Sequence, residues 1–203
     1  MPRARPESRD RLIGATIDVV RAKGYNATRV EDICAAAGVT KGSFFHHFPS
    51  KDALALAATA AWNEAAARLF AEADFHEAAD PLDRLIGYVA FRKAAMAGDL
   101  TGCTCFAGTV IQETYLTHPE LTAACERGID MLTAMLTAWI EAAVAHHGRR
   151  GDWSAPSLAQ HMQAVVQGSF VLAKASGDWS AARAALDHLA RYVDMLIRRS
   201  PGA

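Results

Sequence analysis

The 203-residue sequence lacks the features of a membrane or secreted protein. No apolar run approaches the ~20 residues that a transmembrane helix needs. The first residues, Met1 to Arg11, are basic but include Glu7 and Asp10 and have no apolar core, so they do not resemble a secretory signal. Four cysteines are too few for a disulfide scaffold in a chain of this size. These absences predict a cytoplasmic protein with reduced thiols.

β-Branched residues are scarce, since valine and isoleucine together number 19 against 43 alanines. Alanine loses no side-chain entropy in a helix, whereas β-branched side chains lose rotational freedom there. No segment alternates apolar and polar residues as a half-buried strand does. With 51% hydrophobic and 21% charged residues, the chain has the balance of a globular protein, which excludes wholesale disorder. The composition predicts an all-α fold.

Known catalytic patterns are missing as well. The chain has no phosphate-binding glycine loop, no His-Glu-x-x-His pair and no nucleophile elbow. Adjacent carboxylates such as Glu31 and Asp32 are explained by helix capping and surface charge. We therefore expect a protein that is not an enzyme and that needs no cofactor.

Charge is distributed unevenly along the chain. Residues 1–51 carry a net charge of +4 and the remainder a net charge of −5, which together give the overall −1. A basic first quarter favours a polyanionic partner for that part alone. Because four excess charges often form only a solvated face, this observation needs support from a motif.

Nine helices are predicted from apolar periodicity and from helix start and stop residues. Gly24 is a natural end for the first helix, Asp80 and Pro81 begin the fifth, and His146-His147-Gly148 is typical of a helix C-terminus. No repeat or low-complexity linker interrupts them. The predicted ranges are about 8–23, 29–36, 40–47, 51–73, 80–97, 103–117, 120–147, 155–175 and 180–199.

Residues 28–51 contain two short helices joined by a turn with Gly38, the arrangement of a helix-turn-helix. Thr28 and Glu31 have the spacing of a capping box, and Gly38 allows the positive φ of the turn. Small and apolar side chains lie where the two helices pack: Val30, Ile33, Cys34, Val39, Phe44 and Phe48. The outward positions of the second helix are Thr40, Lys41, Ser43, Phe45 and His46. At this helix start, free N–H groups favour phosphate and side chains can reach base edges in a major groove.

The run from Thr28 to Leu54 closely resembles the DNA-binding domain of the TetR family of bacterial repressors, and the resemblance covers residues 8 to about 55. It includes the threonine cap, the glycine turn, the Phe44-Phe45-His46-His47-Phe48 block and the Ser50-Lys51 opening of the next helix. The remaining two-thirds are similar to the family only in the expected number of helices. The resemblance implies an all-α protein with a helix-turn-helix domain at residues 1–52 and an effector-binding and dimerisation domain at 53–203.

The resemblance also implies roles for single residues. Thr28 would contact phosphate through its capping hydroxyl, and Lys51 would neutralise a phosphate. Base edges and the DNA backbone would be contacted by Thr40, Lys41, Gly42 and Ser43. The family usually has two tyrosines where this chain has Phe45 and His46, so Phe45 retains only van der Waals contact while His46 can still donate an N–H. The basic arm of Arg3, Arg5 and Arg9 could reach the backbone or a minor groove. For His47, whose side faces inward, we expect a structural role.

Binding to two half-sites of DNA requires a two-fold dimer. The last two helices, about 155–175 and 180–199, carry more apolar residues than one packing face needs, which predicts a four-helix bundle across the dimer axis. Burial inside one chain is the alternative. The residues concerned are Val165, Val166, Ser169, Phe170, Ala173, Leu186, Leu189, Ala190, Val193, Leu196 and Ile197.

Aromatic and methionine side chains on the middle helices are candidates to line an apolar effector cavity. At helical spacing such residues also form plain core, and both interpretations stay open. The candidates are Trp62, Tyr88, Phe91, Phe106, Met131, Met135 and Trp139.

Cys103 follows Gly102 at a predicted helix start, where the helix dipole lowers the pKa of a thiol and makes it reactive. This arrangement resembles an electrophile-sensing branch of the family, which implies that Cys103 is the sensor and that Lys174 lies near it. An inert buried cysteine is the alternative. No metal site is predicted, because Cys103-Thr104-Cys105 with a distant His118 lacks the usual zinc spacing.

The predicted function is that of a homodimeric transcriptional repressor, which binds double-stranded operator DNA and is released by a small-molecule or electrophile effector. The competing hypothesis is an all-α enzyme or small-molecule carrier in which the helix-turn-helix is vestigial.

Overall fold

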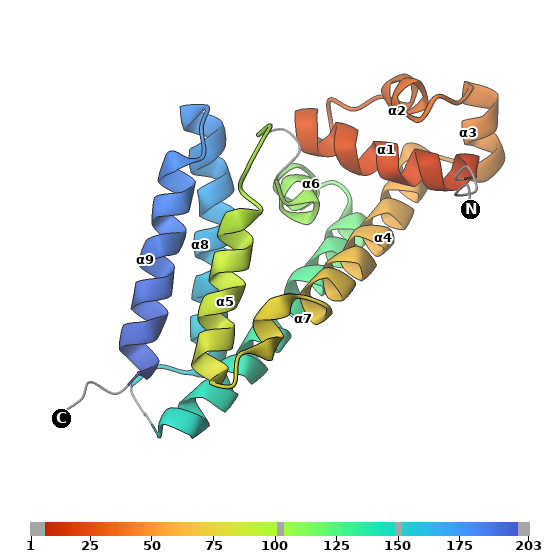
Figure 1. The fold of residues 1–203 in the computed structure, drawn as a ribbon. Coiled ribbons are helices and arrows are strands. Elements are labelled where there is room, and N and C mark those ends of the chain that lie inside the picture. Colours follow the sequence, from red (N-terminus) through yellow and green to blue (C-terminus); the bar gives the residue numbers. More distant parts are fainter. Residues whose placement is uncertain (1–6, 101–103, 149–151, 199–203) are drawn as a thin grey trace, which may run out of the picture. The chain divides into compact units, whose positions relative to one another are not determined.

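The computed structural model describes residues 7–100, 104–148 and 152–198, and these contain helices and no strand (Figure 1). The predicted all-α fold is therefore confirmed. The helices are α1 (Ser8–Lys23), α2 (Val30–Ala37), α3 (Lys41–His47), α4 (Lys51–Ala71), α5 (Pro81–Ala94), α6 (Phe106–Thr114), α7 (Pro119–His147), α8 (Ala155–Ser176) and α9 (Ser180–Ile197), with one 3₁₀ helix, η1 (Asp74–Glu77).

All nine predicted helices are present, and the largest differences concern α5 and α6. α5 ends at Ala94, where the pattern tightens: the N–H of Met96 donates to the carbonyl of Lys93, three residues back, at 3.1 Å. α6 begins only at Phe106, because Cys105 is its N-cap and accepts a hydrogen bond from the N–H of Gly108 through Sγ. The 3₁₀ turn η1 was not predicted, since a single turn has no periodicity to detect.

The chain forms two compact units. The first contains residues up to Arg68 and Thr104–Gly128, and the second contains Leu69–Cys103 and the residues from Ile129 onward. Helices α4 and α7 thus each contribute to both units. The unit that contains the helix-turn-helix also includes α6, although two α-helices, α4 and α5, stand between them in the sequence.

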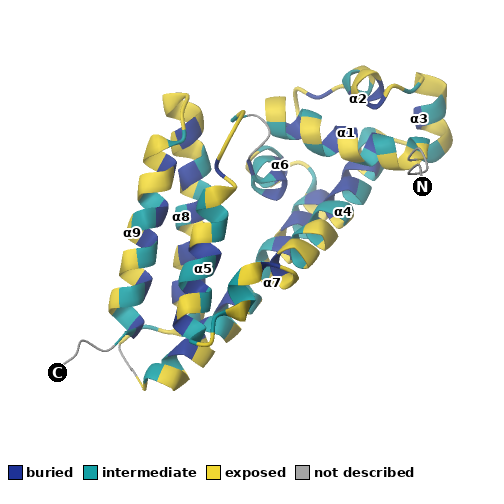
Figure 2. Cartoon of the chain, in the orientation of Figure 1, coloured by how far each residue is buried: buried dark blue, intermediate teal, exposed yellow. Residues whose placement is uncertain are grey.

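The first unit holds two apolar clusters. In one, α1, α2, α3 and the start of α4 enclose Leu12, Ile33, Phe44 and Leu54, all without exposed surface. In Figure 2 these helices show dark blue faces toward one another. The second cluster joins α1 and α4 to α6 and the start of α7, and its buried members are Val20, Tyr25, Ala55, Ala58, Phe106, Ala107, Val110, Leu121 and Cys125.

In the second unit, α5, α8 and α9 lie side by side (Figure 1). Leu186, Leu189, Val193 and Ile197 recur every three or four residues along α9 and are all buried, so α9 presents one apolar stripe to its neighbours. Gly177, at φ +77°, ends α8 and lets the chain turn back into α9.

Helix α7 is the one described helix that is long and apolar enough to cross a membrane by length and composition alone. Leu136, Ile140 and Ala143 of this helix are buried inside the protein. An amphipathic helix of a water-exposed domain accounts for the same pattern.

Candidate DNA-binding surface

The turn between α2 and α3 has the geometry of a helix-turn-helix. Gly38 adopts the left-handed conformation at φ +61° and ψ +42°, which a side chain would strain. The N–H of Val39 donates to the carbonyl of Cys34 at 3.0 Å, which closes the end of α2. Phe44 and Phe48 then point inward and fix one side of α3 against the core.

Arg11 of α1 holds this turn in place. One guanidinium nitrogen donates to the carbonyl of Ala37 at 3.0 Å and to that of Gly38 at 3.3 Å. Carbonyls at a helix C-terminus lack partners within the helix, and a cation there also interacts favourably with the helix dipole. Sequence analysis did not single out Arg11, because the partner carbonyls lie 26 and 27 residues away.

The N-terminal end of α3 is open to solvent. Thr40 caps the helix, since its hydroxyl oxygen accepts a hydrogen bond from the N–H of Ser43 at 3.1 Å. Thr40, Lys41 and Gly42 are exposed and Ser43 is half-buried. A Cβ added at Gly42 would meet only the Thr40 hydroxyl, at an ordinary 3.8 Å. The chain itself therefore leaves this surface uncovered.

Lys41 forms an ion pair with Glu31 of α2, in which Nζ lies 2.7 Å from Oε1. The hydrogen bond and the opposite charge raise the pKa of Lys41 and lower the pKa of Glu31. Both side chains are more than half exposed, at 58% and 61%. Exposed pairs of this kind contribute little to stability, so Lys41 can leave Glu31 for a stronger anion.

Phe45 and His46 continue the exposed side of α3. Phe45 is 53% exposed, and its ring lies nearly perpendicular to that of Phe44, with the ring centroids 5.0 Å apart. His46 is exposed and stacks edge-on against His47. His47, by contrast, is half-buried and shares a hydrogen bond of 3.0 Å between Nε2 and the Ser8 hydroxyl, in keeping with the structural role expected for it.

The predicted capping box at Thr28 and Glu31 is wrong by one residue. The N-cap of α2 is Arg29, whose N–H donates to the Asp32 carboxylate at 2.8 Å. The hydroxyl of Thr28 instead donates to the carbonyl of Gly24 at 2.6 Å and is buried. The tight loop after α1 brings that carbonyl over Thr28, and a buried carbonyl needs a donor more than the exposed helix start does.

Lys51, predicted as a phosphate contact, has its ammonium group engaged inside the protein. Nζ donates to the carbonyls of Tyr25 and Thr28, each at 3.1 Å, and lies 4.1 Å from the centroid of the Tyr25 ring. Burial lowers the pKa of Lys51. In this arrangement Lys51 fastens the loop between α1 and α2 to the start of α4.

The basic arm is described only in part. The Arg9 guanidinium lies 5.4 Å from the centroid of the Phe48 ring and is exposed. Arg3 and Arg5 lie outside the described residues.

The candidate effector residues are divided between the two units. Trp62 and Phe106 belong to the first, where their rings lie 6.0 Å apart and Phe106 is fully buried in the core. Tyr88, Phe91 and Trp139 belong to the second. There Phe75 of η1 joins them, with ring centroids 6.0 Å from Tyr88, 5.8 Å from Phe91 and 5.5 Å from Trp139.

Sequence analysis missed Phe75, since it lies in the unpredicted 3₁₀ turn. An open hollow beside it is lined by Leu69, Glu72, Ala73, Asp74, Phe75, Gly87 and Phe91. Of the other candidates, Met135 is half-buried on α7, Met131 is exposed on the same helix and Lys174 is exposed on α8.

Cys103 lies outside the described residues, and so does any pairing with Lys174. Of the three described cysteines, Cys34 and Cys125 are buried and Cys105 is half-buried. Burial raises the pKa of Cys34, and it raises that of Cys125 to about 11. Both buried thiols therefore stay protonated and unreactive at neutral pH.

Most apolar residues assigned to the dimer interface are buried inside one chain. Their burial fits the alternative of a core within one chain, since α5 and α8 both pack against α9. They are Val166, Ser169, Ala173, Leu186, Leu189, Val193 and Ile197. A different set of apolar side chains on α8 and α9 is exposed, namely Val171, Leu172, Tyr192 and Met195.

Two family profiles match the chain. One is described as bacterial regulatory proteins of the tetR family and matches residues 12–58. The other is described as a tetracyclin repressor-like C-terminal domain and matches residues 81–189, which is more than half of the sequence.

Curated relatives and solved structures agree with these matches. The chain is 33% identical over 115 residues to the transcriptional regulator AcuR of Cereibacter sphaeroides, covering 55% of this chain and 52% of the relative. It is 47% identical over 51 residues to the regulator CymR of Pseudomonas putida, covering 25% of each. The matches thus span a quarter to about half of these relatives.

Among solved structures, a TetR-family regulator from Agrobacterium tumefaciens superimposes with a TM-score of 0.82 at 25% identity, covering 91% of this chain and 96% of that one. A TetR regulator from Chloroflexus aurantiacus superimposes with a TM-score of 0.82 at 25% identity, and the match covers 96% of this chain and 98% of that one. The reduced form of NemR from E. coli has the same fold, with a TM-score of 0.79 at 21% identity. That match covers 96% of this chain and 100% of NemR.

Proposed function

The chain belongs to the TetR family of bacterial transcriptional regulators, and on that premise we propose that it is a repressor that binds operator DNA as a homodimer and leaves it when a small-molecule effector binds. Its helix-turn-helix makes it a DNA-binding regulator and not an enzyme. A protein of this kind acts on DNA, and we assign it to the bacterial cytoplasm.

The open N-terminal end of α3 is the observation that carries this proposal. The inner side of α3 is held by Phe44 and Phe48, so its outer side presents Thr40, Lys41 and Gly42 at the helix start. A recognition helix enters the major groove by its N-terminal residues, which contact base edges and phosphates there. We assign DNA binding to residues 1–52 and effector binding with dimerisation to 53–203.

Individual contacts follow from chemistry. Lys41 exchanges Glu31 for a phosphate, and phosphate contacts set the register of the protein on the duplex. Gly42 permits close approach of the backbone, and Ser43 and His46 offer donors. Phe45, although exposed, has an apolar ring that fits a thymine methyl group. Thr28 and Lys51 support this surface from inside, by holding the loop between α1 and α2.

Two copies are needed to read two half-sites about one helical turn apart. The exposed side chains of Val171, Leu172, Tyr192 and Met195 provide apolar surface on α8 and α9 that the single chain leaves in water. We therefore place the dimer interface on the outer side of these two helices, where a second copy would complete a four-helix bundle.

The effector site is assigned to the aromatic cluster of the second unit, which has an open hollow at Phe75, Gly87 and Phe91. An apolar or aromatic small molecule fits such a lining. The effector is expected to bind more tightly to a conformer whose recognition helices are wrongly spaced for DNA. The most by which it can lower DNA affinity is the ratio of its affinities for that conformer and for the DNA-binding conformer.

DNA binding is tested by titrating the purified protein against the DNA upstream of its own gene. We expect saturable binding that weakens steeply with salt, and Lys41→Ala should lower affinity and reduce the salt slope by about one. Arg127→Ala, which removes an exposed cation from α7, is the matched control and should bind normally. Binding that is indifferent both to salt and to Lys41→Ala would contradict the role proposed for α3.

A further inference from the structure

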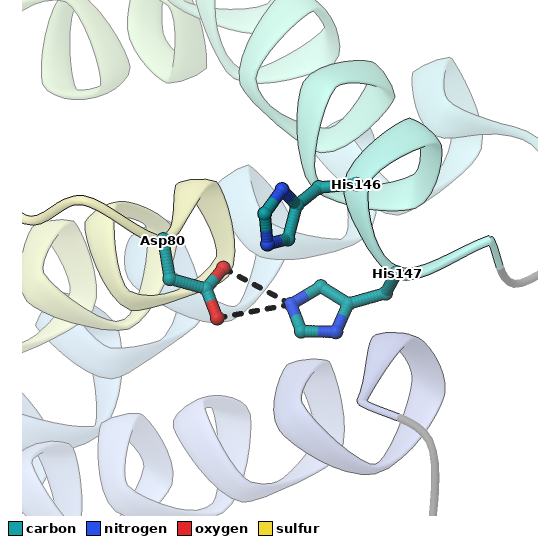
Figure 3. Close-up of side chains that lie close together, drawn as sticks. All are labelled: Asp80, His146 and His147. Carbon is teal, nitrogen blue, oxygen red and sulfur yellow. Dashed lines mark hydrogen bonds and ion pairs between the residues drawn. The ribbon is translucent and has the colours of Figure 1, made fainter.

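Three side chains that can bind a metal converge in the second unit (Figure 3). Asp80 is the N-cap of α5, and His146 and His147 are the last two residues of α7. One ligand atom from each lies within 4.8 Å of the other two. Asp80 and His147 are 67 positions apart in the sequence, so only folding brings them together.

The Asp80 carboxylate is held in position before any ligand arrives. Its Oδ1 accepts the N–H of Leu82 at 2.8 Å, and Pro81 at the first position of α5 restricts the backbone. Nε2 of His147 lies 3.0 Å from Oδ1 and 3.1 Å from Oδ2, so the imidazole points between the two oxygens. The side chains of Asp80 and His147 are only 22% and 15% exposed.

His146 completes the group from the solvent side. It is exposed, and Figure 3 shows its ring turned toward the carboxylate of Asp80 and the ring of His147. Gly148, at φ +66°, ends α7 directly after the pair, so no further helical turn covers the two rings. A small rotation of an exposed side chain is enough to bring its nitrogen onto a shared ion.

The surrounding charge favours a cation. Arg198 lies 3.9 Å from Oδ2 of Asp80, but it is also bonded to Asp83 and Asp194, each at 2.7 Å. Three carboxylates therefore face one guanidinium.

We propose that Asp80, His146 and His147 form a binding site for a divalent transition metal ion, with Zn²⁺ as the best match. Two imidazole nitrogens and one carboxylate oxygen are a common zinc ligand set, which leaves a fourth position for water. Zinc–ligand bonds of about 2.0–2.1 Å put neighbouring ligand atoms of a tetrahedron roughly 3.3 Å apart. His147 and Asp80 already have nearly that separation.

The ion takes the place of the proton that His147 and Asp80 now share. Nε2 of His147 must present its lone pair to the metal, so its proton moves to Nδ1 or to solvent. Oδ2 of Asp80 coordinates while Oδ1 keeps the Leu82 N–H, which leaves the cap of α5 intact. The bound metal links the start of α5 to the end of α7 and stabilises the second unit.

The test measures Zn²⁺ binding to the full-length, metal-free protein by competition with a chromogenic chelator. We expect one zinc ion per chain at this site. His146→Ala should weaken its binding by about tenfold or more, since the loss of even an outer-shell partner costs 10–100-fold. His188→Ala removes an exposed histidine from α9 and is the matched control. Asp80→Asn keeps a capping side chain but loses the charge, and should also weaken binding.

His146 is exposed, so its replacement should leave the circular dichroism spectrum and the metal-free melting temperature unchanged. The melting temperature of the wild type should rise with Zn²⁺ and that of His146→Ala should not. The proposal is overturned if the wild type shows no saturable binding, or if His146→Ala and Asp80→Asn bind like the wild type. A thiolate charge-transfer band with Co²⁺ would also overturn it, because the cysteines would then hold the metal. None of these outcomes depends on whether the protein binds DNA.

Discussion

The carboxylate of Glu113, on α6, accepts a hydrogen bond of 2.7 Å from the backbone N–H of Asn26, in the loop that follows α1. The side chain of Asn26 returns a second bond to the Glu113 carbonyl at 3.3 Å. A Cβ at Gly24 would collide with the same carboxylate, so glycine permits this close approach. Residues 87 positions apart thus join α6 to the end of the first helix of the DNA-binding domain.

Glu113→Ala should lower the free energy of unfolding by about 1 kcal/mol, because a hydrogen bond to a charged acceptor is lost and the Asn26 N–H remains partly solvated. Urea unfolding monitored by circular dichroism measures this change. Gln112→Ala, which removes an exposed neighbour bonded only within α6, is the control and should stay within about 0.5 kcal/mol of the wild type. Equal effects of the two substitutions would contradict the role given to Glu113.

Gly42→Ala should leave the fold intact and lower DNA affinity by about tenfold or more. The new methyl group meets no tight contact within the chain, and alanine favours the helix, so the melting temperature should stay level or rise. On the DNA side the methyl group fills the space that close backbone approach requires. Fluorescence anisotropy with labelled DNA measures the affinity.

The matched control for that substitution is Gly14→Ala on α1, where an added Cβ meets nothing within 4 Å. It should raise stability similarly and leave DNA affinity unchanged. If Gly42→Ala binds DNA as well as Gly14→Ala does, α3 does not approach the duplex by its N-terminal end.

Met195→Asp should dissociate the proposed dimer. Met195 is 71% exposed on α9, so a charge there costs the single chain little, but at an apolar interface it would be buried without a partner. Sedimentation velocity should show the wild type as a dimer and the variant as a folded monomer. Leu116→Asp, at an exposed leucine beyond α6, is the control and should remain dimeric. A dimeric Met195→Asp would place the interface elsewhere.

Alkylation of the native protein should label Cys105 well before Cys34 and Cys125. The two buried thiols have raised pKa values, about 11 for Cys125, so their reactive thiolate fraction at pH 8 is small and their access is blocked. Mass spectrometry of peptides after timed iodoacetamide treatment gives the order. Rapid labelling of Cys125 without unfolding would show that the core around α4 and α7 opens readily.

Local signals were enough for much of the fold. The positions of Gly24, Gly38 and Pro81 correctly predicted helix ends, because a positive φ or a missing N–H constrains the backbone wherever the chain goes next. The spacing of Phe44 and Phe48 correctly predicted the buried side of α3. The 3₁₀ helix η1 was not predicted, since a single turn carries no repeating sequence pattern.

Sequence patterns say less where a side chain has more than one possible partner. Thr28 has the right spacing to cap α2, yet its hydroxyl donates to Gly24, and Asp32 caps instead. Lys51 has the charge to bind phosphate, yet two carbonyls and the Tyr25 ring hold its ammonium group. Nothing within a few residues of either side chain distinguishes these outcomes.

The amino-acid sequence by itself determined the helices, the turn with Gly38 and the open face of α3, because these depend on backbone sterics and on periodicity within a few residues. Only the tertiary structure decided that α5 packs against α9, that Arg11 holds the Gly38 turn and that Asp80 meets His147. Those contacts join segments 27 to more than 60 positions apart, and their energy depends on a geometry that exists only once the chain has packed.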